Sequence, residues 1–298
     1  MTLKLKSTTS FRAIHVNGLE DQEIREHEYQ YQYSEYDDAG HLLMEITYLS
    51  DGSIEHKSSY RYSPEGNLVE ELLIEEDDFV SEHRTMEYNE SGKLWKEQNH
   101  YMDGSYDETI YQYDEEGILQ FRETTGEDGE KGNKVKYEYL VSRPVSEIET
   151  DPDGDIVSEK KVEYDEAGNV VMELLRSHDE YFELLHEYDD KGFRSVTRKY
   201  NEQEELIGRI TYERDADGRS VLIKEETVTG IEVMTLEYDA QGNIILQDTV
   251  SDTGDPISCI ERTYDVNGQQ ITTTVHIEGR GQIPPQDYRI RFESEYFS

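Results

Sequence analysis

Glutamates recur at fixed places in this sequence, and they are the residues best placed to do chemistry together. One set follows a glycine by five positions and comprises Glu45, Glu71, Glu97 and Glu173. A second set directly precedes a recurring tyrosine and includes Glu87, Glu163 and Glu237. If equivalent residues stack along a sheet, both sets could line the same face as a row of carboxylates. Such a row could dock a basic protein, bind cations, or be a solvated face balanced by lysine and arginine.

Other reactive patterns are weaker. Asp151-Pro152-Asp153-Gly154-Asp155 begins like a calcium loop, but position twelve is Val162, where that loop needs a glutamate, so we predict a plain turn. The histidines have no zinc-binding spacing, and no nucleophile elbow, phosphate loop or dinucleotide fingerprint is present. We therefore expect a non-enzymatic protein without catalytic residues, metal or cofactor.

The tyrosines that directly follow the second set of glutamates belong to a repeat of 24 to 26 residues. These anchor tyrosines are Tyr36, Tyr62, Tyr88, Tyr113, Tyr139, Tyr164, Tyr188, Tyr212, Tyr238 and Tyr264. Most begin a Tyr-Asp-x-x-Gly pattern, in which Asp caps the backbone of a type I turn and Gly takes a positive φ. The Tyr139 copy lacks the glycine, and the Tyr212 copy has two extra residues before it.

A second, polar turn falls midway between anchors, as at Asp51-Gly52 and Asp103-Gly104. Between turns, large and polar residues alternate, which is typical of strands of about eight residues. The sequence therefore predicts an all-β fold, an extended antiparallel β-meander of about ten hairpin repeats in a curved or coiled single sheet.

Irregularities divide the predicted array. We expect an N-terminal cap at 1–30, regular repeats at 31–125, an irregular unit or bend at 126–160, further repeats at 161–275 and a C-terminal cap at 276–298. The caps would shield the open edges of the sheet. Asn17-Gly18 is a candidate hairpin turn within the first cap.

Composition limits the partners. The 298 residues carry a formal charge of −40 and only 34% are hydrophobic. Such a surface repels nucleic acid and anionic membranes and attracts basic partners. Cys259 is the only cysteine, and Met1–Lys6 lacks the apolar core of a signal peptide. No run approaches the ~20 apolar residues of a membrane span, so we expect a cytoplasmic protein.

The pattern Tyr-Asp-x-x-Gly-Asn-apolar, best seen at 164–170 and 238–244, resembles the YD repeats of Rhs-type proteins, insecticidal toxin-complex shells and teneurins. The resemblance covers roughly 31–275 and implies long antiparallel sheets that coil. The terminal signature that precedes an Rhs toxin tip is absent from this sequence. A weaker resemblance links it to repeat-bearing immunity or antitoxin-type proteins of bacteria.

Three functions stay open at this point. The first is a protein that binds a basic partner, as an immunity, inhibitor or chaperone protein for a toxin or effector. The second is a structural or surface-associated repeat module, in which charge only maintains solubility. The third is a carbohydrate-active enzyme with paired carboxylates, although no pair can be chosen among 69 acidic residues. The oligomeric state is not indicated by the sequence.

Overall fold

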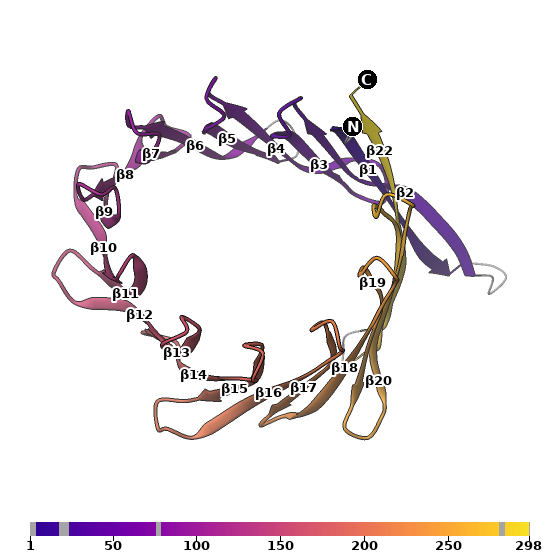
Figure 1. Cartoon of the computed structure of the whole chain (residues 1–298). Coiled ribbons are helices and arrows are strands. Elements are labelled where there is room, and N and C mark those ends of the chain that lie inside the picture. Colours follow the sequence, from indigo (N-terminus) through magenta and orange to yellow (C-terminus); the bar gives the residue numbers. More distant parts are fainter. Residues whose placement is uncertain (1–3, 18–23, 76–78, 280–283, 298) are drawn as a thin grey trace. The chain divides into compact units, whose positions relative to one another are not determined.

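The computed structural model describes residues 4–17, 24–75, 79–279 and 284–297, and their regular elements are all β-strands (Figure 1). The strands are β1 (Leu5–Asn17), β2 (Ile24–Tyr36), β3 (Leu42–Tyr48), β4 (Ile54–Tyr62), β5 (Leu68–Glu75), β6 (Val80–Tyr88), β7 (Leu94–His100), β8 (Tyr106–Tyr113), β9 (Leu119–Thr125), β10 (Lys131–Leu140), β11 (Arg143–Thr150), β12 (Ile156–Tyr164), β13 (Val170–Ser177), β14 (Tyr181–Tyr188), β15 (Arg194–Tyr200), β16 (Leu206–Arg214), β17 (Ser220–Thr227), β18 (Gly230–Tyr238), β19 (Ile244–Ser251), β20 (Pro256–Tyr264), β21 (Gln270–Ile277) and β22 (Gln286–Tyr296). Among these residues there is no helix long and apolar enough to cross a membrane. In the predicted turn at Asn17-Gly18, Asn17 ends β1 and Gly18 lies outside the described residues.

The first and last strands pair with each other. Thr9 in β1 lies opposite Tyr33 of β2 on one side and opposite Glu293 of β22 on the other. The prediction of an extended, curved or coiled single sheet of about ten hairpin repeats is therefore wrong, because the 22 strands form one closed antiparallel sheet. The two terminal segments satisfy each other's backbone hydrogen bonds, so neither has to shield an open edge.

The chain comprises two compact units. Residues 1–83 and 234–298 form the terminal unit, which contains the ladder between β1 and β22, and residues 84–233 form the central unit. Within the central unit, every consecutive pair from β7 to β17 is antiparallel. Successive turns therefore lie alternately at opposite edges of the sheet.

The segment 126–160, where the sequence indicates an irregular unit or bend, contains β10, β11 and the first half of β12. β10 and β11 are joined by a tight turn in which Val141 and Ser142 both have positive φ, 49° and 65°. Two successive positive φ angles are typical of a type I′ hairpin turn, which needs no glycine when strained residues are tolerated. This turn replaces the Asp-x-x-Gly turn of the other copies.

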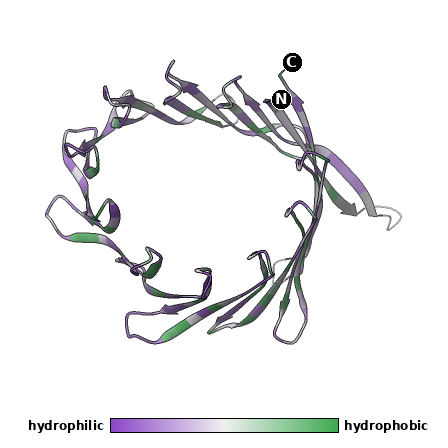
Figure 2. Ribbon diagram, in the orientation of Figure 1, coloured by the Kyte–Doolittle hydropathy of each residue, from purple (hydrophilic) through white to green (hydrophobic). Residues whose placement is uncertain are grey.

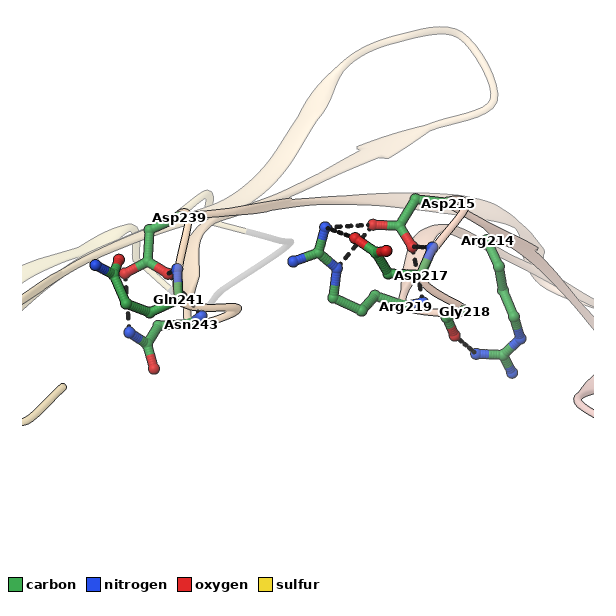
Figure 3. A network of polar contacts seen from close by, with 8 residues as sticks. All are labelled: Arg214, Asp215, Asp217, Gly218, Arg219, Asp239, Gln241 and Asn243. Carbon is green, nitrogen blue, oxygen red and sulfur yellow. Dashed lines mark hydrogen bonds and ion pairs between the residues drawn. The ribbon is translucent and has the colours of Figure 1, made fainter.

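The predicted turn chemistry is confirmed. Asp239 accepts backbone N–H bonds from Gln241 and Asn243 at 2.9 and 2.8 Å, and the Asn243 side chain donates to its other oxygen at 2.8 Å (Figure 3). These bonds, led by that of the Asn243 side chain, lower the pKa of Asp239 below its usual value. Gly242 closes the turn with a φ of +90°, which a glycine adopts without strain.

The anchor tyrosines connect neighbouring hairpins. Seven of the ten lie just after a β-bulge in the ladder, as at Glu163/Tyr164 and Glu187/Tyr188. In four of the anchors, the hydroxyl donates to a backbone carbonyl about twenty residues earlier, at the start of a preceding strand. The donor and acceptor pairs are Tyr113 to Leu94 at 2.7 Å, Tyr164 to Pro144 at 3.0 Å, Tyr188 to Val170 at 2.7 Å and Tyr264 to Ile244 at 3.0 Å.

One anchor is an arginine. The repeat spacing predicts Tyr212 for this role, but the bulge lies between Glu213 and Arg214 and the turn begins directly afterwards at Asp215. The Arg214 guanidinium donates to the carbonyl of Arg194, twenty residues earlier, at 3.0 Å. It also donates to the carbonyl of Gly218 at 3.3 Å (Figure 3). The assignment of Tyr212 as an anchor is therefore wrong, and Arg214 makes the corresponding contact.

Neighbouring turns interlock through one side chain. In four copies, the first residue after a turn covers the glycine of the next turn at the same edge; the pairs are His41 with Gly66, Lys93 with Gly117, Arg143 with Gly168 and Phe193 with Gly218. The same side chains lie against the anchor of that next turn. For example, the His41 and Tyr62 rings stack at 4.6 Å, and the Arg214 guanidinium lies 5.1 Å from the Phe193 ring centre. A Cβ on these glycines would meet the covering side chain.

Apart from Met86, the buried residues are small or polar. Ala13, Val135, Thr109, Thr197 and Thr249 are all at most 7% exposed, and no large side chain is fully buried among the described residues. Hydrophilic residues dominate the ribbon, with short hydrophobic stretches between them (Figure 2). A sheet that buries so little needs few apolar residues, which is consistent with the low hydrophobic fraction.

Candidate partner-binding surface

The two glutamate sets lie on opposite faces of the sheet. In the terminal unit, Ser34 faces Glu45 whereas Glu35 faces Met44. In the central unit, Val162 faces Glu173 whereas Glu163 faces Met172. Since residues directly opposite share a face and successive residues alternate, the expectation that both sets share one face is wrong. The bulge at each anchor fixes this alternation, and it is invisible in residue spacing alone.

The glutamates that follow a glycine are half-buried and bonded locally. Glu45 accepts a hydrogen bond from the Ser34 hydroxyl at 3.3 Å. Glu97 accepts one from the Tyr111 hydroxyl at 3.3 Å and lies 3.7 Å from Arg84. Glu71 lies opposite Tyr60 on the corresponding face. This set therefore forms polar contacts within the sheet rather than an unbroken carboxylate stripe.

The glutamates that precede an anchor are exposed. Glu87 forms an ion pair with Lys96 at 2.5 Å, as expected for a solvated face on which lysine and arginine neutralise the glutamates. Glu163 and Glu237 form no ion pair or side-chain hydrogen bond with other described residues, and both are exposed. Of the predicted binding residues, these two are the best available to a partner.

The buried side chain of His186 contacts both Glu173 and Thr197. Its Nε2 lies 2.9 Å from a Glu173 oxygen and its Nδ1 lies 2.9 Å from the Thr197 hydroxyl. The three residue types resemble a hydrolytic triad. The His186 side chain is completely buried and Thr197 is 6% exposed, so the hydroxyl cannot meet a substrate. We interpret the cluster as a structural contact that fixes Glu173.

Burial gives His186 a predictable pH dependence. Desolvation lowers its pKa below the usual value and outweighs the opposing hydrogen bond to Glu173. Histidine in an unfolded chain titrates at about pH 6.5. The contribution of His186 to stability is therefore fully present above that pH and is lost as the pH falls through the folded-state pKa. Urea unfolding at neutral and mildly acidic pH should show a smaller loss of stability in His186→Gln than in the natural protein.

His276 provides a control of opposite sign. Its hydrogen bonds to Asp287 and Glu278 raise its pKa, so its contribution is present at low pH and is lost as the pH rises through the folded-state pKa. His276→Gln should therefore enlarge the loss of stability on acidification. Equal pH dependence in both variants and the natural protein would contradict the assignment.

The turns midway between anchors give the central unit an acidic edge. We define this edge by the turns at 101–105, 126–130, 151–155, 177–180 and 201–205. They carry twelve carboxylates and no lysine or arginine: Asp103, Glu127, Asp128, Glu130, Asp151, Asp153, Asp155, Asp179, Glu180, Glu202, Glu204 and Glu205. All but Asp151 are exposed. Equivalent turns are about 10 Å apart.

The opposite edge of the central unit is more nearly balanced. Its turns contain ten carboxylates but also four cations, Lys93, Arg143, Lys191 and Arg219. Arg219, for instance, pairs with Asp215 at 2.7 Å (Figure 3). Negative charge is thus concentrated at one edge of the unit. This asymmetry could have been found in the sequence by comparing the charges of the turns at the anchors with those of the turns midway between them. The glutamates that were predicted to bind a partner instead all lie in strands.

Apolar side chains are exposed at the acidic edge as well. Met102 is 80% exposed, Ile156 61% and Leu206 51%. Ile156 and Val157 line a surface cavity of about 520 Å³ together with Tyr181, Arg176 and acidic residues of the adjoining turns. Exposed apolar groups among charges are typical of protein-binding surfaces. No group of three or more His, Cys, Asp or Glu in the described part of the chain is arranged to hold a metal ion.

Comparison with known proteins identifies no family. No family model and no curated protein matches the sequence. Among solved structures, a chain of the Photorhabdus luminescens Tc holotoxin pore is similar at 13% identity and a TM-score of 0.32, over 92% of this chain and 16% of that one. A porin-like protein from Bacteroides uniformis is similar at 10% identity and a TM-score of 0.34, over 98% of each chain. The chain thus spans about 16% of the length of the toxin chain.

Proposed function

We propose that this chain is a non-enzymatic, acidic β-repeat protein that binds a basic protein partner. The observation that supports it most is the acidic edge, where twelve carboxylates, all but one of them exposed, have no lysine or arginine among them. The turn spacing of about 10 Å is close to the Debye length at 0.1 M salt, so the fields of neighbouring turns add. A cationic surface is attracted over this distance and oriented before contact.

Within this proposal, the partner is a basic toxin or effector of a bacterium, and the chain acts on it in the cytoplasm as an inhibitor, immunity protein or chaperone. We also propose that the repeat is of the YD type found in Rhs-like proteins, which rests on the Tyr-Asp-x-x-Gly-Asn pattern at 164–169 and 238–243. The buried state of Thr197 and His186 supports the non-enzymatic part of the proposal.

A pull-down from an extract of the producing cells, followed by binding measurements on the captured protein, tests this function. We expect a protein with an excess of lysine and arginine to be retained at 0.1 M salt and released at 1 M, because the Debye length shrinks from about 10 Å to about 3 Å. Recovery of no protein, or binding that salt does not change, would contradict the proposal.

Charge-matched variants locate the interaction. The edge variant changes Glu127, Glu130, Asp153, Asp155 and Glu204 to the corresponding amides. The control variant does the same to Glu90, Glu115, Glu116, Glu166 and Asp190 at the opposite edge. Both remove five charges from the central unit, so only the position differs. We expect the edge variant to bind at least 10-fold more weakly than the control.

A further inference from the structure

The hairpin of β1 and β2 extends beyond the end of β3, the strand that pairs with β2 on its other side (Figure 1). β2 pairs with β1 along nearly its whole length, from Ile24 to Glu35. On its other side, it pairs with β3 only from Gln32 to Tyr36. Between Glu26 and Gln30, no described strand pairs with β2 on the side away from β1. In an otherwise closed sheet, this segment is a free strand edge, which we call the β2 edge.

The β2 edge is suited to pairing with another strand. About half of the backbone N–H and C=O groups of a strand point to each side, so those directed away from β1 have no ladder partner in any strand that the structure describes. Natural proteins protect such edges with proline, a bulge or charged side chains, especially lysine. Glu26–Gln30 contains no proline or lysine, its two glutamates pair with Arg289 and Arg291, and the bulge in this ladder begins only at Tyr31. One side-chain contact reaches the neighbouring turn, from His27 Nε2 to the Ser50 carbonyl at 2.9 Å.

We propose that the β2 edge receives an extended segment of the basic protein partner as an additional strand. The proposal rests on the proposed function and specifies how the partner is held. Backbone hydrogen bonds supply the affinity in such strand addition, and alternate side chains supply the selectivity. The acidic surface attracts the partner, and the edge then fixes one of its segments.

The side chains of the β2 edge favour a basic strand. His27, Tyr29 and Tyr31 form an aromatic ladder on one face, with ring centres 5.9 and 6.4 Å apart. The Arg12 guanidinium already lies 5.5 Å from the Tyr31 ring centre, so an incoming lysine or arginine can lie over Tyr29 in the same way. On the other face, Glu26 and Glu28 are held by Arg289 and Arg291 at 2.6 and 3.2 Å.

A second copy of the chain is a poorer occupant. Two copies would each bring a formal charge of −40, and this repulsion opposes pairing of the same edges. A basic segment reduces that charge on binding.

Hydrogen exchange with a defined peptide tests the proposal. The probe is an octapeptide of alternating lysine and valine, which is basic and favours an extended strand. Fluorescence anisotropy measures whether it binds, and amide exchange measures where. We expect binding that slows exchange within residues 26–31. The same peptide with alternate backbone N-methyl groups should bind at least 10-fold more weakly, because it cannot complete the ladder.

The readouts separate the two proposals. If neither this peptide nor a cellular protein binds at low salt, the proposed function fails. If the peptide binds without slowing exchange at 26–31, or if N-methylation does not weaken it, the assignment of the β2 edge is overturned while the function stands.

Two matched variants complete the test. Tyr29→Lys places a cation on the β2 edge, and Tyr106→Lys makes the same change at an exposed tyrosine of the central unit. We expect at least fivefold weaker peptide binding for the first and less than twofold for the second; equal effects would overturn the proposal. Sedimentation of the free protein tests whether a second copy of the chain occupies the edge. A dimer that dissociates in the Tyr29→Lys variant would assign the edge to a second copy and overturn the proposal.

Discussion

Thr9→Cys combined with Glu293→Cys is expected to give a disulfide that joins the two ends of the chain and raises the free energy of unfolding by about 5 kcal/mol in the chain-entropy model. The two residues lie directly opposite each other in the ladder between β1 and β22. The disulfide encloses nearly the whole chain, so it restricts the unfolded state more than a short loop would. An open sheet would hold the two positions apart and prevent the bond.

The cross-link is made in a Cys259→Ser background, which removes the only natural thiol. Non-reducing electrophoresis shows whether it forms, and urea unfolding with and without reductant measures the gain in stability. Thr9→Cys with Arg289→Cys is the control, because Arg289 lies opposite Ala13, four positions along the same ladder. If this control pair cross-links as readily, the ends are not held in the register of the structure.

Gly218→Ala is expected to lower the free energy of unfolding by about 2–5 kcal/mol. A positive φ costs an L-residue about 1–2 kcal/mol, and crowding in a packed site costs about 1–3 kcal/mol more. Gly218 has a φ of +84°, and a Cβ there would lie 2.6 Å from the Phe193 ring. The ring would have to move from its position beside Arg214, which would loosen the contact between neighbouring turns.

Gly192→Ala provides the comparison. This glycine has nearly the same φ, +82°, but a Cβ there would have no atom within 4 Å. Urea unfolding should therefore show only the conformational cost, about 1–2 kcal/mol. In a Phe193→Ala background, the cost of Gly218→Ala should fall to the same value, because the obstructing ring is gone. If Gly218→Ala costs as much without the ring as with it, the ring does not cover the glycine.

Local features of the fold can be predicted from the sequence. Asp-x-x-Gly determines a turn through the backbone bonds and conformations of a few adjacent residues, so the roles predicted for Asp239 and Gly242 are confirmed. The pairing of β1 with β22 cannot be predicted in this way. It joins residues almost 290 positions apart, and any free strand edge could in principle satisfy the same backbone groups.

The candidate site is only partly predictable, and the reason is the bulge. A single extra residue reverses which side chains share a face. Glu163 and Glu173 therefore lie on opposite faces, although their spacing indicates one. The acidic edge does not depend on the bulge. It arises because alternate turns of an antiparallel meander lie at the same edge of the sheet. Arg214 escapes a search for tyrosines because it is not aromatic, although its guanidinium reaches the corresponding carbonyl.

The exchange of tyrosine for Arg214 has a consequence for how this repeat can diverge. This contact requires a side chain that donates a hydrogen bond to the backbone carbonyl about twenty residues earlier, and it does not require an aromatic ring. Any side chain long enough to reach that carbonyl with a donor is therefore an acceptable substitute. Distant descendants of such a protein can then lose every recognisable tyrosine while retaining the architecture. A search for relatives that scores a donor at this position, instead of one amino acid, should find members that sequence profiles overlook.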